Sequence, residues 1–185
     1  MSPCAVRVSA MTRLTRQIRA LSVGCAAVLM AAIASPLASA DDGMVKADRI
    51  LVLKSERKLM LMAGDSVVRS MNIALGLMPR GAKEQEGDFK TPEGVYFIEA
   101  KNPDSDYFLS LKVSYPNAAD WDRARRLGVD PGGQIMIHGL PNDPKFDEAS
   151  YSNWDWTDGC IAVSNSDMID IWLMTANNTP IEILP

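Results

Sequence analysis

Cysteine and histidine are scarce in this sequence of 185 residues, which contains three cysteines and one histidine. Two cysteines lie within the first 40 residues, so Cys160 and His138 are alone of their kinds in the remainder. A zinc site usually takes three or four protein ligands, which one thiol and one imidazole cannot supply, so we expect no metal and no other cofactor. A thiol redox protein is also disfavoured, because the remainder has no Cys-x-x-Cys pair and no resolving cysteine.

Basic residues are fewer than acids, with 19 Lys and Arg against 23 Asp and Glu. Four of the basic residues and none of the acids lie in the first 40 residues, which leaves 15 basic residues against 23 acids and a formal net charge of −8 for residues 41–185. Nucleic-acid-binding proteins present a basic face, so we expect no nucleic-acid partner. The balance is compatible with small or cationic ligands.

A long hydrophobic run is missing as well. The main apolar stretch covers 13 residues from Leu21 to Ile33, whereas a helix needs about 20 residues to cross a bilayer core of about 30 Å. Arginines without acids precede the stretch, and the small-x-small cleavage site Ala38-Ser39-Ala40 follows it. We therefore predict a secretory signal peptide over residues 1–40, cleavage before Asp41, and an exported domain over residues 41–185 with no stable membrane anchor.

Two alternatives concern the N-terminus. Met11 is an alternative start, because the stretch that follows it keeps three arginines ahead of the apolar run. Cys25 raises the alternative of a lipid-anchored protein, but most of the apolar run follows this cysteine and the residues before it fit a lipoprotein signal poorly. Export is expected in either case.

Cys160 and His138 form a candidate nucleophile and base. Signal cleavage discards the other two cysteines and leaves Cys160 unpaired in a compartment where disulfides form readily, which favours a chemical use of the thiol. A thiol with the reference pKa of about 8.5 is mostly protonated at neutral pH, and imidazole is the usual base that removes its proton. The alternative is that Cys160 is a small buried apolar residue and His138 a structural one.

Residues 41–185 have the length of one domain, and apolar runs between turn residues predict short strands. The expected strands cover residues 50–53, 58–62, 67–73, 95–98, 109–113, 134–138 and 181–184. His138 ends one of these strands and therefore faces a loop. That loop, residues 140–156, is polar and contains proline, and we interpret it as a segment that covers the substrate.

Two helices are expected. The first runs from Asp120 to Leu127 and ends at Gly128. Its buried face should carry Trp121, Ala124 and Leu127. The second runs from Asp167 to Met174, is capped by Ser166, and should turn Ile171 and Trp172 toward the core.

The residues around the candidate pair carry a specific resemblance. His138-Gly139, then Thr157-x-Gly159-Cys160-Ile161, then Asn165 resemble the signature of the L,D-transpeptidase catalytic domain family, also called the YkuD domain. Further blocks that resemble this domain lie at residues 87–96, 110–117 and 131–139. The block at residues 155–165 is more similar to the YafK-like branch than to the better-known transpeptidases.

The resemblance implies a mainly β fold, a β-sandwich of mixed sheets with a few short helices, in an enzyme of the periplasm. It also implies acyl transfer on peptidoglycan stem peptides. Cys160 would attack the carbonyl of the third stem residue, usually diaminopimelate, and form a thioester. His138 would act as the base, the carbonyl of Gly139 would orient the imidazole, and backbone N–H groups around Gly159 and Cys160 would receive the oxyanion.

Five further residues are candidates for substrate binding: Tyr115, Asn117, Trp154, Trp156 and Asp158. Asp158 stands where better-known members of the family have a second histidine. Its charge opposes thiolate formation but is able to attract an amine. For the aromatic residues the alternative is packing, and for Asp158 it is a turn. Asn165 is expected to fix the backbone after the nucleophile.

Several functions stay open at this stage. The acyl group passes either to an amine, in transpeptidation, or to water, and the YafK-like resemblance favours a hydrolase that releases a wall-linked lipoprotein. A non-catalytic peptidoglycan-binding module is the alternative from another class, and the presence of both His138 and Cys160 argues against it.

Overall fold

The computed structural model describes residue 43 and residues 45–185. The predicted signal peptide and its cleavage site lie outside the described residues. Within the described part, no helix is long and apolar enough to cross a membrane.

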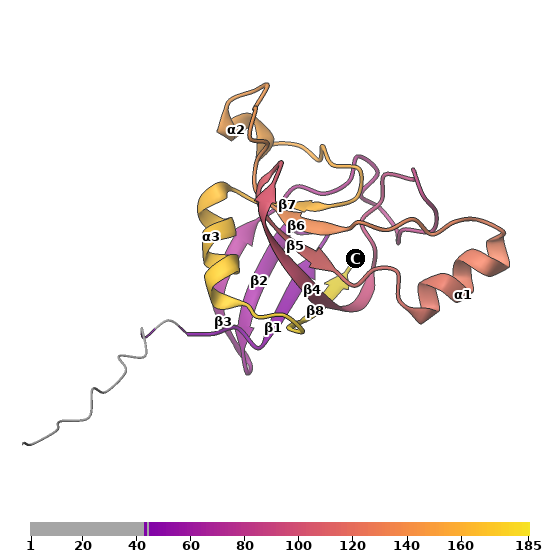
Figure 1. The fold of residues 1–185 in the computed structure, drawn as a ribbon, viewed down its shortest axis with the longest axis horizontal. Coiled ribbons are helices and arrows are strands. Elements are labelled where there is room, and N and C mark those ends of the chain that lie inside the picture. The colour runs from indigo at the N-terminus through magenta and orange to yellow at the C-terminus, as the bar shows by residue number, and fades with distance from the viewer. Residues whose placement is uncertain (1–42, 44) are drawn as a thin grey trace, which may run out of the picture. The chain divides into compact units, whose positions relative to one another are not determined.

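The domain is built on one mixed sheet of eight strands in the order β3-β2-β1-β8-β4-β5-β6-β7 (Figure 1). The β1–β8 and β6–β7 pairs are parallel and the other pairs are antiparallel. The strands are β1 (Arg49–Leu53), β2 (Lys58–Ala63), β3 (Ser66–Asn72), β4 (Gly94–Ser105), β5 (Phe108–Val113), β6 (Met136–His138), β7 (Ile161–Ala162) and β8 (Pro180–Leu184). The prediction of a mainly β fold of mixed strand direction is confirmed.

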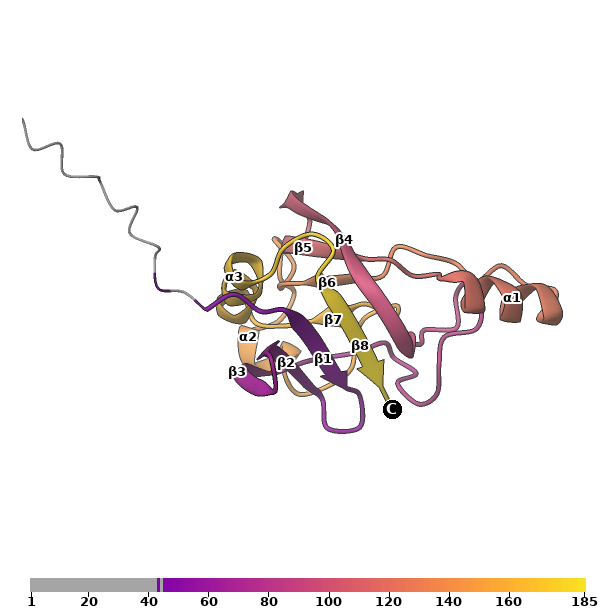
Figure 2. The same cartoon turned by 90° about the horizontal axis from the view of Figure 1, so that it is seen from below.

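Strand β4 joins the two halves of this sheet. Residues 94–97 pair with β8, and residues 98–105 pair with β5, with two irregularities in the second register. Figure 2 shows β1 and β8 side by side. In the strand order, β8 and β1 lie on one side of β4, and β5 and β6 lie on the other. The candidate catalytic residues belong to the β5-β6-β7 half, so β4 connects them to the rest of the core.

The core follows the two-residue period of the strands. Ile50 and Val52 of β1 are fully buried, as are Ile181 and Ile183 of the parallel neighbour β8. Full burial of such a side chain contributes about 1.5–3 kcal/mol to folding. This core supports the site without itself taking part in the chemistry.

Helix α1 (Ala118–Leu127) forms where it was predicted and ends at Gly128, which adopts the left-handed conformation. Its predicted apolar face is wrong, because Trp121 and Leu127 are 45% and 55% exposed and only Ala124 is buried. The helix meets the sheet through a polar contact instead: buried Asp120 accepts a hydrogen bond from the hydroxyl of Tyr96 at 3.0 Å. Figure 1 shows the rest of α1 extending away from the sheet.

Helix α3 (Asn165–Met174) lies beside β5, and its buried Ile171 confirms the predicted inner face. Its N-cap is Ser164 and not the predicted Ser166, because the Ser164 side chain accepts the backbone N–H of Asp167 at 3.1 Å. The loop of residues 140–156 contains a short helix that the sequence did not predict, α2 (Glu148–Tyr151).

Candidate active site

Strands β6 and β7 place His138 and Cys160 at one cavity. His138 is the last residue of β6 and lies opposite Ala162 of β7 in the parallel register. Cys160 directly precedes β7, so both residues emerge at neighbouring positions of two paired strands. Both line a cavity of about 360 Å³. The 22 positions between them in the sequence are therefore bridged by strand pairing.

The imidazole of His138 is buried and held in one tautomer. Its Nδ1 lies 2.7 Å from the carbonyl oxygen of Gly139. A carbonyl oxygen only accepts hydrogen bonds, so Nδ1 carries the proton and Nε2 keeps a free lone pair. Burial lowers the pKa of His138 below its ordinary value of 6.5, and the bond to Gly139 opposes this shift only in part. The group is therefore a neutral base at pH 7.

Two aromatic rings flank the imidazole. The ring centroid of Tyr107 lies 4.6 Å from that of His138, and the centroid of Trp156 lies 5.6 Å from it. Tyr107 and Trp156 also stack on each other at 6.1 Å. These contacts bury the base and account for its lowered pKa.

The thiol of Cys160 is protonated at rest. Its Sγ lies 3.6 Å from the backbone oxygen of Gln134, to which the S–H donates. Burial raises the pKa of Cys160 above its ordinary value of 9.0, and the charge of Asp158 raises it further. The backbone of Met136 and the charge of Lys83 act in the opposite direction. Cysteine and histidine thus form a neutral pair, and the thiolate has to be generated during the reaction.

The turn before the nucleophile is fixed by Thr157, which is buried. Its Oγ1 donates to the carbonyl of Cys160 at 2.8 Å and accepts the N–H of Gly159 at 3.2 Å. Gly159 has a φ of 134°, which other residues rarely adopt. The N–H of Gly159 is therefore engaged, whereas the N–H of Cys160 has no acceptor among the described residues. Of the two predicted oxyanion donors, the structure leaves the Cys160 N–H free.

Three backbone segments meet behind this turn. A Cβ atom on Gly76 would lie 2.1 Å from the carbonyl oxygen of Phe89 and 3.1 Å from the Cα of Gly159. A Cβ atom on Gly159 would lie 2.7 Å from the carbonyl oxygen of Lys90. Both glycines are needed for the close approach that holds the nucleophile turn in place.

An ion pair ties the same turn to the opposite half of the sheet. Arg57, in the β1–β2 turn, contacts Asp155 through Nε at 3.0 Å and Nη2 at 2.6 Å. Asp155 also accepts the N–H of Leu75 at 2.9 Å. Four residues separate Asp155 from the nucleophile, so this contact fixes where the catalytic segment begins.

The cavity contains two of the five predicted substrate-binding residues, Trp156 and Asp158. Tyr115 does not line it, because this residue is 4% exposed and its hydroxyl donates to the carbonyl of Pro131. Asn117 does not line it either, since its side chain caps α1. Trp154 is exposed on the 140–156 loop and lines other surface hollows.

Asn165 fixes backbone on the histidine side of the site. Its Oδ1 accepts the N–H of Leu140 at 2.8 Å, so it holds the segment after His138 and not, as expected, the segment after Cys160. Among the described residues, no group of three or more His, Cys, Asp and Glu side chains is arranged to hold a metal ion.

The β4–β5 hairpin supplies part of the cavity that sequence reasoning missed. Its lining residues are Asn102, Asp104, Ser105, Asp106, Tyr107 and Ser110. The hairpin precedes His138 by some 30 positions and has no motif of its own. The signal that would have found it is the pairing register of β5 with β6, in which Ser110 lies opposite His138.

The chain is similar to known proteins both in sequence and in structure. The family model of the L,D-transpeptidase catalytic domain, YkuD, matches residues 47–183. The protein YafK of Escherichia coli K12 is 43% identical over 61 residues, which are 32% of this chain and 23% of YafK.

Solved structures share the fold. The helical cell shape determining protein Pgp2 from Campylobacter jejuni matches with a TM-score of 0.54 and 27% identity over 72% of this chain. Bd1075 from Bdellovibrio bacteriovorus matches with a TM-score of 0.52 and 26% identity over 77% of this chain. The matches cover 46% and 49% of those two structures, so this chain corresponds to less than half of each.

Proposed function

The chain belongs to the L,D-transpeptidase catalytic domain family, and we propose that it is a periplasmic cysteine enzyme that transfers the acyl group of peptidoglycan stem peptides through a thioester on Cys160. The catalytic domain is residues 41–185, released from a signal peptide over residues 1–40. The observation that carries the proposal is the placement of a tautomerically fixed His138 and a half-buried Cys160 thiol on one cavity.

Acylation begins with a proton transfer. Nε2 of His138 takes the proton of the Cys160 thiol, and the sulfur attacks the diaminopimelate carbonyl carbon. The N–H of Cys160 donates to the oxyanion that develops. When the C–N bond breaks, the imidazolium returns its proton to the departing amine, which leaves a neutral imidazole and a thioester.

Deacylation repeats these steps with another nucleophile. His138 takes a proton from water or from an amine, the nucleophile attacks the thioester, and the C–S bond breaks as the sulfur regains its proton. The resemblance of residues 155–165 to the YafK-like branch leads us to propose water as the acceptor, and hence release of a lipoprotein from the wall. Transpeptidation uses the same acyl-enzyme and differs only in the acceptor.

The test is incubation of the protein with peptidoglycan that carries covalently bound lipoprotein, beside its Cys160→Ala variant as the matched control. Mass spectrometry of the muropeptides identifies the products. Released lipoprotein or its terminal residues, dependent on Cys160, are the expected result of a hydrolase. New cross-links or exchanged terminal residues identify a transpeptidase. Products that are the same with both proteins would refute the thioester and leave a wall-binding module.

A further inference from the structure

Acidic side chains outnumber basic ones in the lining of the cavity. Its lining, within the part of the chain that the structure describes, contains three aspartates and no lysine or arginine: Asp104, Asp106 and Asp158. The reaction proposed above uses only the thiol, the imidazole and a backbone N–H. The three carboxylates are therefore left without a role in it, although they create a negative potential at the mouth of the cavity.

A second, independent feature lies below these carboxylates. Ser110 is only 4% exposed, lines the cavity, and its hydroxyl has no hydrogen-bond partner among the described residues. The hydroxyl is thus the polar end of a nearly buried side chain; it is the part that reaches the cavity, and it is free to bind a ligand. In the sheet, Ser110 lies opposite Asn102 of β4 on one side and opposite His138 of β6 on the other. These three residues form a polar row across the floor of the cavity.

The hairpin that carries these groups is held in place. Asn142 accepts the N–H of Phe108 at 2.9 Å and donates to the carbonyl of Ser105 at 2.8 Å, on either side of the hairpin turn. The N–H of Gly139 donates to the carbonyl of Tyr107 at 3.1 Å. The hairpin is therefore attached to the segment after His138, and its position relative to the base is fixed.

The carboxylates and the Ser110 hydroxyl lie on the side of the cavity that receives the amine portion of the substrate. His138 has to return its proton to the departing amine, so the amine side of the substrate lies beside the imidazole. Ser110 is the cross-strand neighbour of His138, and the ring of Tyr107 lies 4.6 Å from it. An aromatic face next to carboxylates is a favourable environment for an ammonium or guanidinium group.

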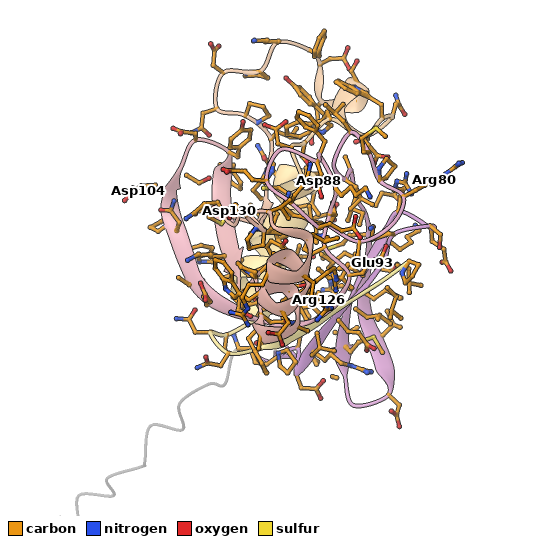
Figure 3. All side chains as sticks on the ribbon, turned by 90° about the vertical axis from the view of Figure 1, so that its right-hand side faces the viewer. Arg80, Asp88, Glu93, Asp104, Arg126 and Asp130 are labelled. Atoms are coloured by element: carbon orange, nitrogen blue, oxygen red, sulfur yellow. The ribbon has the colours of Figure 1, made fainter. Side chains whose placement is uncertain are left out.

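We propose that Asp104, Asp106, Tyr107, Ser110 and Asp158 form a cation subsite, which binds a lysine or arginine side chain of the peptide on the amine side of the reacting bond. The cation is separate from the reacting nitrogen, which has to be neutral to attack a thioester. Figure 3 shows Asp104 at the outer edge of the β4–β5 pair. We expect an approaching peptide to meet this carboxylate before the chemistry begins. The inference rests on the proposed function, because that function defines the amine side.

The test compares two synthetic substrates. In both, the diaminopimelate carbonyl of a stem tripeptide is linked by an amide bond to a dipeptide, whose second residue is lysine in one and norleucine in the other. Norleucine keeps the aliphatic chain and lacks the charge. We expect kcat/KM to be about threefold to tenfold higher for the lysine substrate, since each exposed charge pair contributes a small factor. The preference should fall in 0.5 M salt, where charges are strongly screened.

The Asp104→Asn/Asp106→Asn double variant should reduce the lysine preference to within about a factor of two. The matched control is Asp65→Asn, which changes an exposed carboxylate in the β2–β3 turn and should keep the preference of the parent protein. An equal kcat/KM for the two substrates in the parent, or an unchanged preference in the double variant, would overturn the cation subsite while leaving the proposed function intact.

A binding measurement covers the case in which neither substrate is turned over. Calorimetric titration of the Cys160→Ala protein with both peptides should show tighter binding of the lysine peptide, and the added Asp104→Asn/Asp106→Asn changes should abolish the difference. Equal affinities overturn the subsite. Tighter lysine binding without Cys160-dependent turnover in the parent supports the subsite and rejects the proposed chemistry.

Discussion

Substitution of Gly76 by alanine should damage the nucleophile turn, although Gly76 does not line the cavity. The new Cβ would lie 2.1 Å from the carbonyl oxygen of Phe89 and 2.9 Å from its carbonyl carbon. Ordinary contacts begin at about 3.4 Å, so the Phe89 carbonyl has to move by more than about 1 Å. That oxygen accepts the N–H of Met78 at 3.0 Å, and the movement breaks this hydrogen bond.

The expected cost follows from these contacts. Overpacking in a close-packed region costs about 1–3 kcal/mol, and loss of the hydrogen bond from Met78 adds about 0.5–1.5 kcal/mol. Alanine restricts the unfolded chain more than glycine does, which offsets about 0.4–1 kcal/mol. The free energy of unfolding should therefore fall by about 2 kcal/mol. Because the Cβ would also lie 3.1 Å from the Cα of Gly159, displacement of the nucleophile should lower kcat/KM by about 10- to 100-fold.

Gly133→Ala is the matched control, because the added Cβ would meet no atom within 4 Å. Urea unfolding of the parent and both variants gives the change in stability, and the rate of Cys160 alkylation by iodoacetamide reports on the nucleophile turn. Gly133→Ala should unfold within about 1 kcal/mol of the parent. A Gly76→Ala protein with parental stability, alkylation rate and turnover would refute the steric argument.

Three further predictions concern the catalytic pair and its supports. The acidic limb of kcat/KM against pH should lie below pH 6.5, because burial lowers the pKa of His138 and the base stays unprotonated down to that pKa; an acidic limb above pH 7 would contradict this. The rate of Cys160 alkylation should keep rising with pH up to and beyond pH 9, since burial raises the thiol pKa above 9.0 and the reactive thiolate increases until the pH exceeds that pKa; a rate that is already maximal at pH 6 would indicate a resting ion pair instead. Arg57→Ala should lower the free energy of unfolding by about 1–2 kcal/mol and lower kcat more than it raises KM, with partial rescue in Arg57→Lys; an unchanged kcat would show that the contact with Asp155 has no role in positioning Cys160.

The sequence predicted those features that depend on local pattern. Alternating burial along β1 and β8, the end of α1 at Gly128, and the proximity of a sole histidine to a strand end all follow from neighbouring residues. The buried face of α1 was not predictable in this way, because the helix meets the sheet through the carboxylate of Asp120 and leaves the apolar Trp121 exposed. A hydrophobic pattern gives no information about a helix that packs through a hydrogen bond.

The sequence predicted only those parts of the candidate site that carry local motifs. The blocks around His138 and Cys160 carry their own motifs, whereas Tyr107 and Ser110 reach the cavity only through the register of β5 with β6. Trp154 and Trp156 are two positions apart and look equivalent in the sequence. Only Trp156 packs against His138, and the contact of the intervening Asp155 with the distant Arg57 holds this part of the chain in place.

The position of β8 has a consequence for folding. This strand is the last in chain order, yet it lies between β1 and β4, and its partner β1 is some 130 residues away. Contacts of such long sequence separation form late and slow the folding of a chain. Until residues 180–184 have paired, no strand lies between β1 and β4 to connect the strands β1-β2-β3 with the strands β4-β5-β6-β7. The sheet that carries the nucleophile is therefore completed only at the end of assembly, and the unpaired edges of β1 and β4 are exposed until then.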